Sequence, residues 1–513
     1  MNKEFIDKSF RKTFSKIEAG LFDLWACTEG GIILGEQLMN FFMEFVNKFL
    51  GQAPLLLGTV VLVGYLLMGK KFYEALAGFI KAFVGFKILQ VGTGGLVKTF
   101  APIITALTEK FGIKAFVIDP YFGQTSGVEV LNAVNSLQYV GYVMIIAFAW
   151  NIALVIFRKQ TKIRPLFITG HIMYQQSAVL LWALYAVIEG SGAPVTPLLV
   201  GVTGILLGTY WSVMSNLVIE ATQEVTDGAG FTLGHQQMLG AWAAYKLGKL
   251  VGDKEKSVDH MQFPGWLSLF NDNIVSNVIL MTAFVGSIML IVGKDAFEYD
   301  ASKYWFGTYI FETTAFFAVY ITIILTGVRM FVAELTTSFQ GISDKLLQGA
   351  VPAVDCAVTF GYAPNAPTFG FIFGFFGQLL AIGLLVLLKS PILIIAGFIC
   401  LFFDNGTLAI FANKSGGRRA AAIVPFVAGI IQVLGSALVL TFLKDNELVI
   451  GWMGMFDWAT LWTGTVIASK LLGIVFPIVL IVGMLILPQI HYRRYKETYF
   501  TTMRDTRSVE SSK

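Results

Sequence analysis

The chain has 513 residues, of which 56% are hydrophobic even without its 52 glycines, and its mean hydropathy is +0.70. Soluble chains reach about 45–50% with glycine included, so this composition excludes an ordinary soluble protein and indicates a polytopic membrane protein. The formal net charge of +4 is too small to suggest a nucleic-acid partner, and the three cysteines form no CxxC pair. We therefore expect no disulfide framework, no metal site and no cofactor.

The first half begins with a basic, partly amphipathic extension over residues 1–38, followed by residues 39–50, which suit a helix lying in the membrane interface. Apolar runs then follow, each near the ~20 residues that a helix needs to cross a bilayer. They cover residues 53–68, 73–97, 139–157, 165–188 and 195–214. Residues 99–125 contain Pro102, Lys110 and Asp119, so we expect an amphipathic or re-entrant hairpin there.

A polar, glycine-rich segment (216–265) separates this half from a second series of apolar runs. These cover residues 275–292, 306–327, 369–388, 392–411, 421–442 and 467–487. Residues 329–367 are too polar to face lipid. The apolar runs together predict an all-α fold of about eleven transmembrane helices. The positive-inside rule places the basic loops at 158–164 and 414–419 and the tail at 491–513 in the cytoplasm, but this count leaves the basic N-terminus outside.

Two matches at one sequence offset indicate an internal repeat. Asp119 and Asp355 are 236 residues apart (355 − 119), and the same offset carries Gly170 onto Gly406. Five spans lie between matching points, so the halves would be inverted in the membrane, as in many transporters with broken helices. We therefore expect one repeat over residues 39–215, a second over residues 266–445, and a last helix at residues 466–488.

Polar side chains inside apolar surroundings are the strongest functional signal. His171 and Gln175 lie in one apolar run, His235 and Gln236 form a second histidine–glutamine cluster, and Asp355 lies in the polar hairpin. Such residues in a membrane protein usually line a cavity or face the bundle interior. Together they suit a small polyhydroxylated or weakly acidic solute. The alternatives are a helix–helix hydrogen bond for His171, an ordinary loop histidine for His235, and a helix cap or buried structural pair for Asp355.

Six longer motifs resemble those of a known family. They are QAPLLLG (52–58), TGHIMYQQ (169–176), TQEVTDG (222–228), GHQQ (234–237), GVRMFVAEL (327–335) and YAPNA (362–366). The chain resembles the ascorbate-type EIIC permeases of the bacterial phosphotransferase system. The resemblance covers an EIIC domain over residues 39–490 and leaves out the basic lead-in and the tail.

The resemblance implies a homodimer in the bacterial inner membrane, with a core domain that carries the substrate in an elevator-like movement and a V-motif scaffold domain. It implies that L-ascorbate is phosphorylated as it enters by a separate cytoplasmic EIIB, which carries a phosphocysteine supplied through EIIA. The permease itself would not be an enzyme. The implied substrate contacts are Pro120, Tyr121, His171, Ile172, Met173, Tyr174, Gln175, His235, Gln236 and Asp355. The family has a threonine at the position of Pro120, and proline offers neither a hydroxyl nor an N–H, so Tyr121 is the better candidate there.

Two other classes of protein remain open at this stage. An ion-coupled secondary transporter of a similar small anion would depend on a proton gradient and not on phosphotransferase proteins. A membrane receptor or scaffold would move no solute, although it would have no need to bury polar hairpins. A polytopic enzyme is least expected, because no nucleophile–base pair or metal cluster is visible in the sequence.

Overall fold

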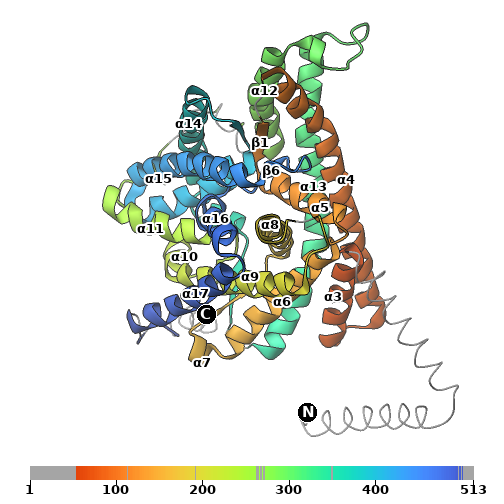
Figure 1. Ribbon diagram of the computed structural model, residues 1–513. Helices are drawn as coiled ribbons and strands as arrows, with labels where there is room; N and C mark the ends of the chain where they lie inside the picture. Colours follow the sequence, from red (N-terminus) through yellow and green to blue (C-terminus); the bar gives the residue numbers. More distant parts are fainter. Residues whose placement is uncertain are drawn as a thin grey trace, which may run out of the picture.

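The computed structural model describes residues 53–111, 114–190, 192–261, 265, 269, 272–347, 350–494, 496, 497, 499 and 500. The expected N-terminal extension (1–38) and interfacial segment (39–50) lie outside these residues. The described part is mostly helical, as predicted for a polytopic membrane protein. Figure 1 shows a row of long helices on one side and a denser group of helices and short strands on the other.

The row of long helices is held together by paired polar side chains. It consists of α3 (Ala53–Leu67), α4 (Phe72–Phe111), α12 (Asn273–Val292) and α13 (Phe306–Leu346). The Tyr65 hydroxyl of α3 donates to Oε2 of Glu334 on α13 at 2.5 Å, and Nζ of Lys81 on α4 lies 3.3 Å from Oε1 of the same carboxylate. Glu334 thus joins three helices, which explains why otherwise apolar helices carry these groups.

The predicted hairpin at residues 99–125 is wrong over residues 99–111, and the polar segment at 329–367 contains more helix than expected. Residues 99–111 continue α4 through Pro102, and residues 329–346 continue α13. Lys110 had suggested a break, but its ammonium donates to the carbonyls of Ile291 (3.1 Å) and Val292 (2.5 Å) at the end of α12. A basic side chain that satisfies the last carbonyls of a neighbouring helix is a favourable helix cap.

The denser group contains the remaining helices. They are α5 (Pro120–Ala133), α6 (Gln138–Ile156), α7 (Arg158–Thr161), α8 (Gly170–Ile188), α9 (Pro197–Leu217), α10 (Ile219–Val225), α11 (Met238–Val251), α14 (Ala366–Leu387), α15 (Asn405–Leu443), α16 (Thr463–Leu472) and α17 (Val475–Arg494). Across the described residues, seven helices are long and apolar enough to cross a membrane. Those spans are Phe72–Gly92, Gln138–Ile156, Gly170–Ile188, Pro197–Leu217, Ala366–Leu387, Cys400–Leu443 and Val475–Arg494.

Two glycines change the predicted pattern of spans. The span expected at residues 392–411 is wrong in its first part, because Ile392–Ala396 form a β-strand. Its last part and the span expected at residues 421–442 share one long helix, α15, which bends sharply at Gly417 (φ +63°). A Cβ at that glycine would lie 2.1 Å from the Asp253 carbonyl oxygen, so both the backbone conformation and the close contact require glycine. The predicted last helix at 466–488 is two helices, α16 and α17, divided at Gly473 (φ +59°).

Short strands depart from the all-α prediction. One parallel sheet has the order β5 (Ile392–Ala396), β1 (Lys114–Ile118), β6 (Gly451–Trp452), and the other has the order β2 (Pro165–Phe167), β4 (Val351–Val354), β3 (Thr232–Leu233). Each sheet combines strands from before residue 234 with strands from after residue 350. Because all strands in a sheet run parallel, their carboxyl ends meet at one edge, where loops and helix starts gather.

The described part of the C-terminal tail packs onto the helices. Tyr499 is buried, and its carbonyl oxygen accepts from Nη1 of Arg164 at 2.6 Å. The Tyr499 hydroxyl accepts from Nδ2 of Asn216 at 2.8 Å and donates to the Lys162 carbonyl oxygen at 2.7 Å. Arg164 directly precedes β2, so these bonds tie the tail to the strand that leads into α8.

The crossing of α14 and α15 permits a test of this packing. A Cβ at Gly377 would lie 2.0 Å from the Phe426 carbonyl oxygen, whereas a Cβ at Gly383, on the same helix, would meet nothing within 4 Å. We expect Gly377→Val to lower the free energy of unfolding by about 1–3 kcal/mol, because overpacking forces two backbones apart. Thermal unfolding of purified protein in detergent measures this. Gly383→Val is the matched control, and equal losses in both variants would contradict the packing argument.

Candidate functional site

Three polar side chains lie at one edge of the β2-β4-β3 sheet. His171 lies on the first turn of α8, four residues after β2 ends, His235 follows β3 by two residues, and Asp355 directly follows β4. Parallel strands present their carboxyl ends together, so residues far apart in the sequence meet here. The structure thus places His171 at the start of a helix that follows a strand, rather than in the middle of a continuous helix.

These three residues form a compact cluster, called below the His–His–Asp cluster. Nε2 of His171 lies 3.3 Å from Oδ2 of Asp355, and the centroids of the two imidazole rings are 6.2 Å apart at an angle of 66°. One nitrogen from each histidine and one carboxylate oxygen lie within 4.8 Å of one another. His235 is buried, but 15% of the His171 side chain and 33% of the Asp355 side chain are exposed, so a small molecule can reach the cluster.

Asp355 has two roles at this edge. Its Oδ1 accepts from the backbone N–H of Ala357 at 2.9 Å and so caps the short helix Cys356–Tyr362, while its Oδ2 faces His171. The helix-cap interpretation is therefore correct, and it leaves the second oxygen available to the cluster. A carboxylate that is fixed by a backbone bond has little freedom to lose when it binds a ligand.

Gln237 orients the His235 ring. Its Oε1 lies 2.6 Å from Nδ1 of His235 and also accepts from the backbone N–H of Gln236 at 3.0 Å. Its Nε2 donates to Oγ1 of Thr407 at 3.1 Å. Since the Gln236 N–H needs an acceptor, the Gln237 amide oxygen must face His235, and Nδ1 must carry the proton. Nε2 of His235 is then left with a free lone pair.

Two buried polar atoms beside the cluster have no partner among the described residues. Nε2 of Gln236 donates to Oε1 of Gln175 at 2.7 Å, but Oε1 of Gln236 makes no bond. Nδ1 of His171 is likewise buried and unpaired. An unsatisfied buried polar atom costs about 1–3 kcal/mol, so these atoms are the natural contacts for a bound polar molecule.

Burial sets the protonation state of the cluster. Burial lowers the pKa of His235 below its ordinary value, so the imidazole is neutral at pH 7. Burial also opposes the ionisation of Asp355, yet His235, His171 and the Ala357 amide keep the pKa of that carboxyl below its usual range. Burial raises the pKa of the neighbouring Cys356 thiol, so this thiol stays protonated and unreactive.

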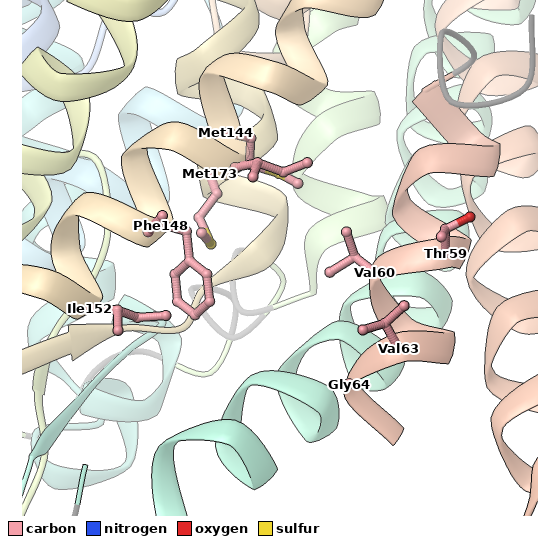
Figure 2. A pocket seen from close by; sticks show the side chains of 10 residues that line it. Thr59, Val60, Val63, Gly64, Met144, Phe148, Ile152 and Met173 are labelled. Carbon is pink, nitrogen blue, oxygen red and sulfur yellow. The ribbon is translucent and has the colours of Figure 1, made fainter. Parts of the chain in front are cut away.

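The other predicted site residues lie in different surroundings. Ile172 is buried, and Tyr174 packs edge-on against Phe86 of α4, with ring centroids 5.0 Å apart. Pro120 and Tyr121 begin α5, just after the carboxyl end of β1, which belongs to the β5-β1-β6 sheet. Met173 lines an apolar crevice of 310 Å³ between α3 and α6 (Figure 2). Of the predicted residues, His171, His235 and Asp355 form the cluster, and the Gln175–Gln236 pair lies beside it.

Sequence reasoning missed two residues that position the site. Gln237 was visible in the GHQQ motif but had no assigned role. Asp457 is fully buried and accepts from the backbone N–H groups of Leu239 and Gly240, at 2.9 and 2.8 Å, and from the Tyr210 hydroxyl at 2.6 Å. It thereby holds the first turn of α11, directly after the His235 loop. In the sequence, Asp457 could have been noticed as the single carboxylate within the aromatic segment 452–462.

The helices and the buried polar cluster define a polytopic membrane protein with a small polar site. Residues 48–490 match the family model EIIC-GAT, described as a PTS system sugar-specific permease component. The chain therefore belongs to this family of phosphotransferase-system permeases. It is similar to the "Ascorbate-specific PTS system EIIC component" of Mycoplasma pneumoniae, with 33% identity over 431 residues. That alignment covers 76% of this chain and 65% of the relative's length. The family predicted from the motifs is thus confirmed.

Proposed function

We propose that this protein is the EIIC permease of a phosphotransferase system and that it binds L-ascorbate and carries it inward. The observation that supports this most directly is the His–His–Asp cluster, with its unpaired polar atoms in buried surroundings. The name of the Mycoplasma relative supports the same substrate. Ascorbate carries several hydroxyl groups, so a site that presents hydrogen-bond acceptors, among them the Gln236 Oε1 and the second oxygen of Asp355, suits it.

The roles of the side chains follow from their contacts. Nε2 of His235 and the carboxylate of Asp355 each accept from a hydroxyl, and His171 bonds to a ring oxygen or a further hydroxyl. Gln236 offers its unpaired Oε1 to a second hydroxyl, with Gln175 fixing its amide. Ile172, Met173 and Tyr174 follow His171 on α8 and are included as contacts of the substrate. Their inclusion and that of Pro120 and Tyr121 rest on the family resemblance.

Strand pairing supports the proposal of two inverted repeats. If β1, β2 and β3 correspond to β4, β5 and β6, exchanging the two sets converts the order β5-β1-β6 into β2-β4-β3, which is the second sheet. The capping aspartates also correspond. Oδ1 of Asp119 accepts from the N–H two residues later (3.0 Å), as Oδ1 of Asp355 does (2.9 Å). We assign residues 39–215 and 266–445 to the repeats; β3 and β6 lie just beyond their respective ends, so the correspondence of the strands extends past these bounds.

The division seen in Figure 1 suggests the transport mechanism. The long helices α3, α4, α12 and α13 form the V-motif scaffold, and the strand-containing group forms the mobile core of an elevator in a homodimer. A cytoplasmic EIIB, charged through EIIA, phosphorylates ascorbate when the core faces inward, so the permease does no phosphoryl chemistry itself. The protein lies in the bacterial inner membrane with its C-terminus and residues 491–513 in the cytoplasm.

Uptake of labelled L-ascorbate tests this function. The protein is expressed in cells that lack their own ascorbate permease, with and without EIIB. We expect phosphorylated ascorbate to accumulate only when EIIB is present. Uptake of unmodified ascorbate that ignores EIIB and collapses with the proton gradient would instead indicate a secondary transporter. No uptake, with the protein present in the membrane, would contradict the choice of ascorbate.

A further inference from the structure

We propose that the His–His–Asp cluster is also a binding site for a divalent transition-metal cation of the zinc class. We further infer that this cation competes with the sugar for the cluster, a part of the inference that rests on the proposed function. Two imidazoles and one carboxylate converge here from three different elements, and this is a recurrent ligand set for zinc and its neighbours.

The distances suit a metal ion. With bonds of about 2.0–2.2 Å to zinc, the donor atoms of a tetrahedral centre lie about 3.3–3.6 Å apart. Nε2 of His171 and Oδ2 of Asp355 are already 3.3 Å apart, and all three donor atoms fall within 4.8 Å of one another. Small rotations of the side chains bring the His235 nitrogen to the same spacing. Three protein ligands leave a fourth position for water or for a sugar oxygen.

A second shell of contacts supports the assignment. Metal-binding histidines nearly always donate their other ring N–H to an oxygen, which fixes the tautomer and the ring orientation. His235 does so through Nδ1 to Oε1 of Gln237 at 2.6 Å, and Gln237 is itself anchored to Thr407. Asp355 is held by the Ala357 amide in the same manner. His235 and Asp355 are therefore oriented before a metal arrives, whereas Nδ1 of His171 has no partner among the described residues.

The sequence did not predict this site because its ligands follow three separate strands. Metal-binding motifs are usually recognised by short spacing, and here the ligands come together only through the pairing of β2, β4 and β3. The strands fix the positions of the backbones, so the cluster does not depend on flexible loops. The partial exposure of His171 and Asp355 gives a cation a path of entry.

Binding of Co²⁺ to the purified full-length protein in detergent tests the proposal. Cobalt reports its coordination through visible absorption bands, and Zn²⁺ should then displace it. We expect one ion per chain, bands typical of nitrogen and oxygen ligands in a four- or five-coordinate centre, and loss of these bands in His235→Ala. Gln237→Leu should weaken binding about 10- to 100-fold while keeping the same bands, because it alters only the second shell. His491→Gln, a histidine outside the cluster, is the matched control.

Unchanged Co²⁺ binding in both His171→Ala and His235→Ala would overturn the metal site. Loss of binding in His491→Gln alone would place the ion elsewhere and overturn it equally. Both results leave the transport proposal untouched, because ascorbate uptake is measured separately. Added L-ascorbate should raise the apparent Kd for Zn²⁺, and an unchanged Kd would contradict the competition while leaving the metal site standing.

Discussion

Replacing His235 by alanine is expected to lower ascorbate uptake by about 10- to 100-fold. The imidazole is buried, is oriented by Gln237, and presents Nε2 toward the cluster. Losing a hydrogen bond to a charged or strongly polar group costs about 1.5–3 kcal/mol, and each 1.4 kcal/mol is a factor of ten. We expect the same range for His171→Ala, and near-complete loss of uptake in the double variant. Initial rates of labelled ascorbate uptake in the presence of EIIB measure the effect.

The amount of protein in the membrane must be matched for this comparison. His491→Gln serves as a control, because this histidine lies near Glu220 on another part of the molecule, with Nε2 3.5 Å from the carboxylate. Uptake near the wild-type rate in both His171→Ala and His235→Ala would refute the cluster as the substrate site. A loss that followed protein abundance, and not the rate per molecule, would indicate a structural role only.

The largest effect on stability is expected at Asp457. This carboxylate accepts three bonds, from the Tyr210 hydroxyl and from the amides of Leu239 and Gly240. Asp457→Ala removes the charge and leaves these donors buried without an acceptor. Each buried donor that is left without an acceptor costs about 1–3 kcal/mol, so we expect a strongly lowered unfolding temperature or failure to accumulate. Thermal unfolding in detergent and the yield of folded protein measure this.

Two further variants show how much of the loss in stability comes from the buried Asp457 network. Tyr210→Phe removes one donor and leaves the other two satisfied, so it should cost only about 1 kcal/mol. Asp300→Ala removes an exposed carboxylate that bonds to the nearby residues Ser302 and Lys303, and it should change stability little. Losses of similar size in Asp457→Ala and Asp300→Ala would show that the buried network does not stabilise the fold.

Patterns in the sequence predicted the class of fold well and its breaks poorly. Most apolar runs became helices near their predicted bounds; α6 (Gln138–Ile156) and α14 (Ala366–Leu387) are examples. Polar residues such as Lys110 were interpreted as breaks because composition does not show which neighbour satisfies them. The short strands were not predicted, because a run of two to five residues beside a helix has no distinctive period. Their existence depends on partners hundreds of residues away.

The site was predicted in part, and for an identifiable reason. His171, His235 and Asp355 are polar groups in apolar surroundings, and this pattern can be recognised in a single sequence. Which of the ten predicted contacts would meet could not be predicted, because that depends on strand register. Gln237 and Asp457 act through other residues, so their importance is visible only in the bonds that they make.

The exchange of strands between early and late parts of the chain bears on how the protein is made. β2 cannot pair with β4 until synthesis has advanced from Phe167 to Val351, which is 184 positions later (351 − 167). At about 5–20 residues per second this delay is roughly 10–40 s. During that time the polar start of α8 lacks the strand partner that positions it in the folded protein, and a chain that stops before residue 350 can complete neither sheet.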